Sequence, residues 1–353
     1  MWSRNTLTDH LGLDCPIILA PMAGATTPEL AAAVSNAGGL GSLGLATSPT
    51  DAAEEQIAAF RALSNRSLNI NFFCHADPGD VSDTGAAMRA RLQPYYTAKG
   101  LGDVPVPRVP YGPFGPEQLD LVLRHRPRVV SFHFGLPQPE LLSSVKSSGA
   151  FVMSSATTVA EALWLEAQGV DAVIAQGLEA GGHRGTFLET DPTCQAGLFA
   201  LLPQITSAVR VPVVAAGGIA DGRGVAAALM LGASAVQIGT AFLRCPEAAV
   251  HPLHRAALAT ARDDGTCLTC LISGKPARML RNRFIDELKD AEALTAPFPA
   301  QMAITGPLLR GSADPDFLPM LAGQAAALSR EMAAGDLVRM LTTETAGCLS
   351  KAS

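Results

Sequence analysis

Short apolar runs alternate with amphipathic stretches along most of the chain. Each run is mostly apolar along its length, and most of the runs do not alternate between apolar and polar positions as a half-exposed strand would. This is the pattern of parallel strands that are buried on both faces. The predicted strands are Ile17–Pro21, Leu40–Leu43, Leu68–Phe73, Val129–Phe134, Phe151–Ser154, Ala172–Ala175, Val213–Ala216 and Ala235–Ile238.

The intervals between these runs have helical periodicity, and several end at a glycine, which commonly follows a helix C-terminus. The predicted helices are Thr27–Ala37, Pro49–Leu63, Glu117–Arg124, Pro139–Ser147, Thr158–Gln168, Phe199–Val209 and Gly224–Leu231. Strand-then-helix units that follow one another eight times predict an α/β fold, a closed (β/α)8 TIM barrel rather than an open doubly wound sheet.

Two regions depart from this alternation. Residues 75–116 are rich in Pro, Gly and Asp and connect the third strand to the next helix, where a barrel commonly carries a lid. Residues 265–353 follow the last unit and contain helical patterns at Phe317–Ala334 and Asp336–Thr342. We therefore predict a barrel over residues 1–264, with 75–116 as an excursion, and a helical extension over 265–353 packed on it.

Composition narrows the classes of partner. The net charge of −6 argues against nucleic acid and anionic membranes. We expect a cytoplasmic protein without membrane spans, as a monomer or homodimer, because no leader pattern or long apolar run is present. The cysteines number seven, which favours reduced thiols, and the Cys267–Cys270 spacing lacks the partner ligands of a zinc site. We expect no metal.

The segment after the sixth strand combines glycines with one histidine. Gln176 is followed by Gly177, Gly181, Gly182 and His183. Glycines allow positive φ and close approach of backbone to a ligand, and histidine titrates near neutral pH. Since barrel enzymes place their chemistry at the carboxyl ends of strands, His183 is a candidate for contact with a substrate.

Glycine turns also follow the seventh and eighth strands, at Gly217–Gly218 and Gly239–Thr240. Turns at these two strands, next to a helix N-terminus, form the common phosphate site of such barrels. The backbone N–H groups of Gly218, Gly239 and Thr240 are predicted to face phosphate oxygens, with the Thr240 hydroxyl assisting.

A planar ring fits beside this phosphate site. Asn69 and Asn71 place two amides on one side of the third strand, and Ala20, Pro21 and Met22 offer a small apolar surface after the first. A phosphate clamp next to an amide-lined ring site predicts flavin mononucleotide, FMN. The glycine motifs of ATP and dinucleotide sites are absent from the strand–helix junctions.

The roles of the other charged and titratable residues are less determined. His133 ends the fourth strand between two phenylalanines and either lines the substrate site or is a satisfied structural histidine. Lys275 and Arg278 either supply positive charge near the flavin or are surface charges. The remaining histidines are expected at the surface or on helix flanks: His10, His75, His125, His251 and His254.

The chain resembles the nitronate monooxygenase family. The matching segments are residues 16–44, 130–137, 176–185, 215–224, 236–242, 273–284 and 322–328, which include EAGGHRG at 179–185 and QIGTAF at 237–242. The resemblance implies FMN-dependent oxidation of alkyl nitronates by O2, through a flavin semiquinone, to carbonyl compounds and nitrite. It also implies propionate 3-nitronate as the natural substrate.

The resemblance assigns roles by position. His183 is implied to be the base for neutral nitroalkanes or, when protonated, an anchor for the anionic substrate, and His133 and Tyr111 line the substrate site. The family's C-terminal tyrosines have no counterpart, so the pocket is expected to differ in detail. The implied flavin contacts are Met22, Asn71, Gln176, Gly181, Gly182, Gly217, Gly218, Gln237, Ile238, Gly239 and Thr240.

Other functions fit the same pattern. An FMN barrel that takes hydride from NAD(P)H, an enoyl-thioester or quinone reductase, would use the same phosphate and ring site. A cofactor-free isomerase or lyase would use the phosphate site for its substrate. A non-catalytic binding protein fits least, because polar groups converge around a reactive histidine.

Overall fold

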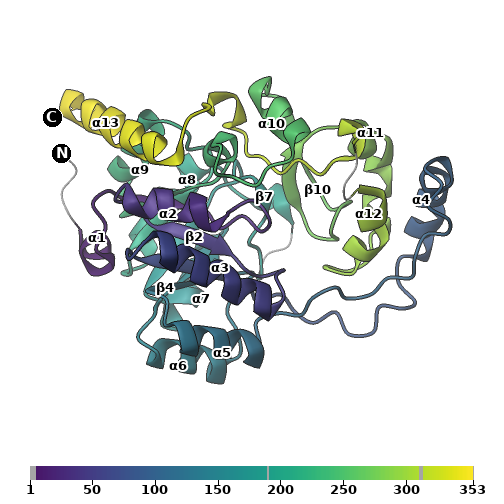
Figure 1. Ribbon diagram of the computed structural model, residues 1–353, viewed down its shortest axis with the longest axis horizontal. Coiled ribbons are helices and arrows are strands. Elements are labelled where there is room, and N and C mark those ends of the chain that lie inside the picture. Colours follow the sequence, from purple (N-terminus) through teal and green to yellow (C-terminus); the bar gives the residue numbers. More distant parts are fainter. Residues whose placement is uncertain (1–4, 189–190, 310–312, 353) are drawn as a thin grey trace.

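The apolar runs form the predicted barrel (Figure 1). The computed structural model describes residues 5–188, 191–309 and 313–352. Within these residues, parallel strands form one eight-stranded sheet in the order β1-β9-β8-β6-β5-β4-β3-β2, and a bridge between Ile18 and Leu40 joins its two ends. The strands are β1 (Ile17–Leu19), β2 (Gly41–Gly44), β3 (Leu68–Phe73), β4 (Val129–His133), β5 (Phe151–Ala156), β6 (Ala172–Gln176), β8 (Val213–Ala216) and β9 (Ala235–Ile238).

Helices cover the outside of the barrel, close to the predicted positions. Their starts follow local chemistry: the Thr27 and Thr158 side chains cap two of them, and Asp221 accepts from the Arg223 and Gly224 amides at a third. The barrel helices are α2 (Pro28–Asn36), α3 (Thr50–Leu63), α5 (Pro116–His125), α6 (Pro139–Ser147), α7 (Val159–Ala167), α8 (Leu198–Ala208) and α9 (Gly222–Met230).

A short N-terminal helix, α1 (Thr6–Leu11), closes one end of the barrel. Its Leu7 and Leu11 are buried in one cluster with inward-facing strand residues such as Met153 and Val214. Because apolar side chains fill this end, a ligand has access to the barrel only from the carboxyl ends of the strands.

A second apolar core lies outside the barrel. It joins the excursion, with α4 (Ala86–Ala98), to the C-terminal extension, with α11 (Arg283–Leu288) and α12 (Gln301–Leu309). In Figure 1, α4, α11 and α12 form a lobe on the right, away from the barrel. We call residues 81–104, 265–309 and 313–321 the cap. The excursion is therefore part of a packed body and not a separate loop.

The C-terminal extension, predicted to be helical, also contains strands. Strands β10 (Thr266–Thr269) and β11 (Ala277–Leu280) pair antiparallel, and β11 also pairs with β7 (Gly182–His183) from the glycine–histidine segment. The sequences of β10 and β11, TCLT and ARML, lack the continuous apolar run that marks the barrel strands, and β7 has only two residues. The β7–β11 pairing ties the barrel loop to the cap.

The predicted helix Phe317–Ala334 is wrong. Apart from short 3-10 turns at Pro315–Phe317 and Ala326–Leu328, the segment is irregular, and Leu321 bridges to Met279 of β11. Pro319 and Gly323 interrupt the helical pattern.

The predicted helix Asp336–Thr342 lies within the longer α13 (Ala334–Ala352), which packs on α9 and α2. Helices α10 (Pro252–Ala259), α11 and α12 were not predicted. None of the helices in the described ranges combines the length and apolar character needed to span a bilayer.

Candidate active site

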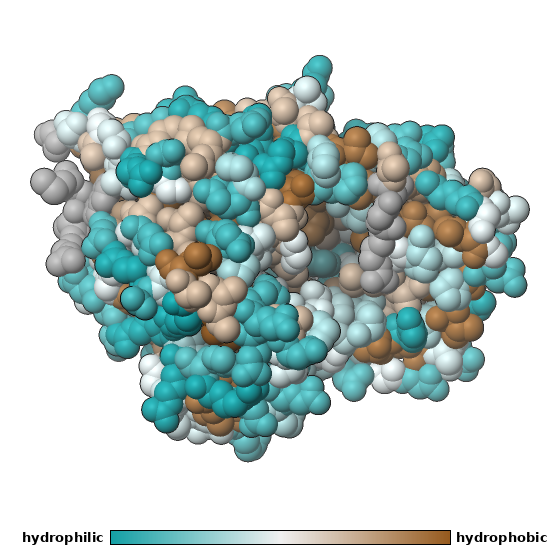
Figure 2. All heavy atoms as spheres, in the orientation of Figure 1, coloured by the Kyte–Doolittle hydropathy of each residue, from teal (hydrophilic) through white to brown (hydrophobic). Residues whose placement is uncertain are grey.

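The glycine–histidine segment lies where the barrel meets the cap. Figure 2 shows a hollow between these two lobes, with hydrophobic side chains inside it. In β7, His183 pairs with Ala277 and Gly182 pairs with Arg278 of the cap strand. The site is thus formed by barrel strand ends on one side and cap residues on the other.

Two side chains from the barrel hold the backbone of His183. Gln176 donates from Nε2 to the His183 carbonyl at 3.0 Å and accepts from the Gly185 amide at 2.8 Å. His133 donates from Nε2 to the same carbonyl at 3.2 Å. Both residues were predicted to face the ligands, and here their hydrogen bonds position His183.

The protonation state of His133 follows from its partners. Since Nε2 donates to a carbonyl, the neutral ring accepts at Nδ1 from the Ser155 hydroxyl, 2.9 Å away. Burial lowers the pKa of His133 to about 3, so the ring is neutral at pH 7. The Gly185 backbone packs directly against this ring, because a Cβ on Gly185 would lie 2.8 Å from His133 Cε1.

The His183 ring is held by a cap residue that the sequence analysis missed. Its Nε2 lies 2.8 Å from the Ser273 hydroxyl, and its Nδ1 makes no hydrogen bond to any described residue. Burial, together with the positive charge of Lys275, lowers the pKa of His183 to about 4. The ring is therefore neutral at pH 7 and able to accept a proton. Ser273 is the first residue of segment 273–284, which resembles the family, and this resemblance could have indicated a role for Ser273.

Arg184, directly after His183, is fully buried and was also missed. It donates to Gln195 Oε1 at 2.7 Å and to the carbonyls of Gly177 and Gln176 at 2.6 and 2.8 Å. Burial lowers the pKa of Arg184 to about 10, so it remains charged at pH 7. Its guanidinium thus fixes the two ends of the glycine loop to each other.

Aromatic rings surround His183. The ring centroids of Phe298, Phe134 and Phe73 lie 5.4, 6.0 and 6.4 Å from that of His183. Tyr111 extends this group, 6.3 Å from Phe73. Phe134 has a positive φ of 69°, a conformation that costs a non-glycine residue on the order of 1 kcal/mol or more and that clusters at functional sites. Phe298 comes from the cap and was not predicted.

His75 belongs to this group, and its predicted surface position is wrong. It is 6% exposed, its ring lies 5.0 Å from Phe298 and 5.9 Å from Tyr111, and both its nitrogens are buried without hydrogen-bond partners. Burial and the charge of Lys275 lower the pKa of His75 to about 4. His254 is also buried, on helix α10.

The two cationic candidates differ in their surroundings. Arg278 is 5% exposed and donates to the Leu178 carbonyl at 3.0 Å and to Thr266 Oγ1 at 3.1 Å, so it anchors the loop to the cap sheet. Lys275 is half-buried, with its ammonium 4.9 Å above the centre of the Phe134 ring. Lys275 thus belongs to the aromatic group around His183.

The glycines near the predicted phosphate site occupy positions where a side chain would clash with a neighbouring segment or strain the backbone. A Cβ on Gly181 would lie 2.5 Å from the Gly323 amide nitrogen, so the segment around Gly323 crosses directly over the loop. The Gly323 amide donates to Thr240 Oγ1 at 2.9 Å, which leaves the Thr240 hydroxyl proton free to donate elsewhere. Gly217 and Gly218 have positive φ values of 110° and 71°.

The ring side of the predicted cofactor site has an unsatisfied acceptor. Gln237 Oε1 is buried without a hydrogen-bond partner, and such atoms are usually satisfied by a ligand or water. Met22 lies against Gly239, where a Cβ would be 3.5 Å from its sulfur. Asn71 donates twice to Ser131 and keeps its oxygen as an acceptor.

Ile238 contributes only a buried wall, since its carbonyl accepts from the Ala20 amide at 2.8 Å. The exposed Gly218 backbone, the Thr240 hydroxyl and the unpaired Gln237 oxygen together fit a phosphorylated cofactor with a hydrogen-bonding heterocycle.

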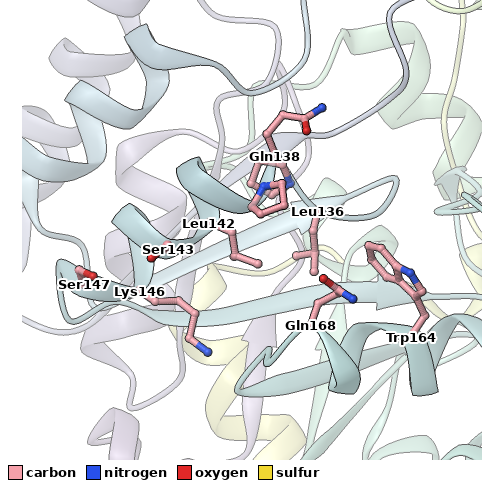
Figure 3. A pocket seen from close by; sticks show the side chains of 10 residues that line it. Leu136, Gln138, Leu142, Ser143, Lys146, Ser147, Trp164 and Gln168 are labelled. Carbon is pink, nitrogen blue, oxygen red and sulfur yellow. The ribbon is translucent and has the colours of Figure 1, made fainter.

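A cavity of about 690 Å³ lies elsewhere, on the outside of the barrel. Figure 3 shows Leu136, Leu142, Trp164 and Gln168 converging on it between α6 and α7. None of the residues around His183 lines it.

Cys267 and Cys270 are half-buried free thiols.

Several known proteins resemble this chain over most of its length. A family model described as nitronate monooxygenase matches residues 4–344. A nitronate monooxygenase of Pseudomonas aeruginosa is 43% identical over 352 residues, covering 97% of this chain and 99% of the relative. One of Paraburkholderia phytofirmans is 41% identical over 359 residues, covering 97% and 95%. The crystal structure of a nitroalkane oxidase from Streptomyces ansochromogenes superposes with a TM-score of 0.89 at 37% identity, covering 99% of this chain and 100% of that one.

Proposed function

This chain belongs to the nitronate monooxygenase family of flavin-dependent oxidoreductases, and on that premise we propose that FMN is its flavin and propionate 3-nitronate its substrate. In the reaction, the nitronate and O2 yield a carbonyl compound and nitrite. Bound FMN supplies the electron-transfer chemistry, and the protein supplies position, electrostatics and exclusion of water.

The observation that carries the proposal is the neutral His183 ring inside the aromatic group. The Ser273 hydroxyl donates to the Lys275 carbonyl at 3.3 Å and so accepts from His183 Nε2–H, which leaves Nδ1 with the lone pair that accepts the α-proton of a neutral nitroalkane. A pKa of about 4 keeps this nitrogen unprotonated at pH 7, which favours the role of base over that of cationic anchor. A nitronate has already lost that proton, so its oxidation does not require the base.

The residues around His183 keep this geometry fixed. Gln176 and His133 bind its carbonyl, Ser273 binds its ring, and the three phenylalanine rings surround it. We propose that Met22, Asn71 and Gln237 face the flavin ring, while the turns Gly217–Gly218 and Gly239–Thr240 hold the phosphate. The buried Gln237 oxygen supports the former assignment and the exposed Gly218 backbone the latter.

Anaerobic mixing of the purified holoenzyme tests the proposal. We expect propionate 3-nitronate to bleach the flavin absorbance, and the aerobic reaction to consume O2 and release nitrite. Bleaching by NADH or NADPH but not by the nitronate would overturn the proposal in favour of an NAD(P)H-linked reductase. A colourless protein that retains no flavin would favour the cofactor-free alternative.

A further inference from the structure

Among the described residues, none forms an ion pair with Lys275. Its ammonium donates to the Thr186 carbonyl at 3.1 Å and lies 3.5 Å from Thr186 Oγ1, and within the described ranges no carboxylate oxygen comes within ion-pair distance of it. Burial lowers the pKa of Lys275, which reflects the loss of water around the charge. A half-buried cation without a counter-ion is expensive, and an anionic ligand would offset that cost.

The carboxylate whose charge acts on Lys275, that of Glu161, does not serve as this counter-ion. Glu161 is fully buried, and its two carboxylate oxygens accept hydrogen bonds from the amides of Thr157, Phe187 and Leu188 and from the Thr157 hydroxyl. Its oxygens are therefore engaged with the backbone. It raises the pKa of Lys275 only as a secondary influence, behind burial.

The histidines around the aromatic rings carry no positive charge at pH 7. The pKa values of His75 and His183 are lowered to about 4 and that of His133 to about 3, in each case mainly by burial. Asp77 acts on His75 from the excursion, and Arg184 is occupied with backbone carbonyls. Lys275 is left as the cation of this ring group.

Lys275 also lies beside the catalytic histidine. It is two residues after Ser273, which binds the His183 ring, and Thr186 is three residues after His183. The Lys275 ammonium and the two rings of His133 and His183 all lie around Phe134, at 4.9, 4.5 and 6.0 Å from its centre. The Lys275 ammonium and the His183 ring therefore lie around the same phenylalanine, and they are close enough for the charge of Lys275 to lower the pKa of His183.

We propose that Lys275 forms a carboxylate subsite, which binds the distal carboxylate of a short ω-carboxyl nitronate while His183 faces the reacting carbon. This inference rests on the proposed function and adds a specificity-determining residue to it. It explains why the site would prefer a dianionic substrate over a plain alkyl nitronate. It does not require Lys275 to take part in proton or electron transfer.

Two nitronates of the same shape separate this role from general attraction of anions. The first is propionate 3-nitronate, and the second is 3-methylbutyl-1-nitronate, in which an isopropyl group replaces the carboxylate. In the Lys275→Met variant we expect KM for the first to rise about 10- to 100-fold, the range for losing a charged hydrogen bond. The KM for the second should change less than about threefold, with kcat similar for both.

Lys275→Arg should restore most of the lost affinity for propionate 3-nitronate. Lys99→Met is the control, because Lys99 also lies over a phenylalanine ring, 4.1 Å from the centre of Phe317, but it is exposed on the cap and pairs with Asp314. It should leave both KM values unchanged. An equal rise in KM for both nitronates, or no rise for either, would overturn the proposal.

Binding of unreactive substrate mimics tests the carboxylate subsite independently of turnover. Succinate and 4-methylpentanoate carry a carboxylate in place of the nitronate group, and only succinate has the second carboxylate. By calorimetry on the holoenzyme, Lys275→Met should weaken succinate at least about tenfold and leave 4-methylpentanoate unaffected. Unchanged succinate affinity would overturn the subsite, whereas absence of nitronate turnover by the wild type would contradict the proposed function alone.

Discussion

The two ends of the proposed site differ in composition: one is formed by backbone and the other by side chains. The phosphate end, Gly217–Gly218 and Gly239–Thr240, consists of the backbone of two tight turns that follow β8 and β9. The histidine end consists of side chains from β3, β4, the glycine loop and the cap, which meet around His183. A backbone site tolerates substitutions that keep its conformation, whereas the histidine end depends on individual side chains.

The largest effect is expected at the histidine end, for His183→Asn. Removal of the base should lower kcat/KM for nitroethane about 10²- to 10⁴-fold, the usual contribution of general base catalysis. Turnover of ethyl nitronate, which has no proton to lose, should fall far less. Steady-state O2 uptake with both substrates measures the difference. Equal losses on both would mean that the histidine acts on the nitronate form.

Acid should weaken the histidine end next. The pKa values of His75, His133 and His183 are lowered from 6.5 to about 4, 3 and 4. As the pH falls below 6.5, these histidines take up protons in the unfolded chain but not yet in the folded protein. The free energy of unfolding therefore decreases as the pH falls from 6.5 towards 4. At pH 5 each histidine should cost on the order of 2 kcal/mol in the free energy of unfolding relative to pH 7.

Urea denaturation at pH 7 and pH 5 measures this loss. His75→Phe is the matched variant, because a phenyl ring fills the same aromatic environment without titrating. It should remove about one histidine's share of the pH dependence. Equal free energies of unfolding at the two pH values in the wild type would show that these rings are not kept neutral by burial.

A smaller effect is expected from crowding the His133 ring with Gly185→Ala. The added Cβ would lie 2.8 Å from Cε1 and 3.1 Å from Nδ1 of His133, so the ring must shift and its bond to the His183 carbonyl weakens. We expect a loss of about 1 to 3 kcal/mol in stability, from overpacking, with lower kcat for nitroethane.

Gly347→Ala is the control for this substitution, because a Cβ there meets no atom within 4 Å and the residue lies in α13. It should leave activity unchanged and raise stability slightly through helix propensity. If Gly185→Ala behaves in the same way, the contact between Gly185 and His133 has no energetic weight.

The smallest effect is expected at the phosphate end, for Thr240→Val. The hydroxyl accepts from Gly323 and is proposed to assist the phosphate, so its loss should weaken FMN binding about tenfold or less, as for one hydrogen bond. Fluorescence titration of the apoprotein with FMN measures the dissociation constant. A loss of 10³-fold would show that this end depends on side chains as strongly as the other.

The same contrast explains what could be predicted from sequence. The bounds of β3, α6, β8 and β9 agree with the predicted ranges, because short, mainly apolar runs mark the strands and Pro139 at the first position marks the start of α6. The glycine turns were visible because their chemistry is local. Ser273 and Phe298 were missed because they reach His183 only through long-range packing of the cap.

The burial of His75 and Arg184 could not be predicted from the sequence either. A lone histidine before a Pro/Gly-rich stretch has the local pattern of a surface residue, and its burial results from packing against Phe298 and Tyr111. Arg184 is covered because its partners are backbone carbonyls of its own loop, a pattern without a sequence signature.

The pairing of β7 with β11 has a practical consequence for chimaeras between relatives. Since His183 lies on a strand that the cap sheet completes, exchange of residues 265–353 alone would give the histidine a foreign neighbour at Ala277. A cap exchanged to alter substrate range should therefore be transplanted together with residues 181–187 and the excursion 75–116. The natural unit of recombination in this fold is discontinuous in sequence, although it is contiguous in space.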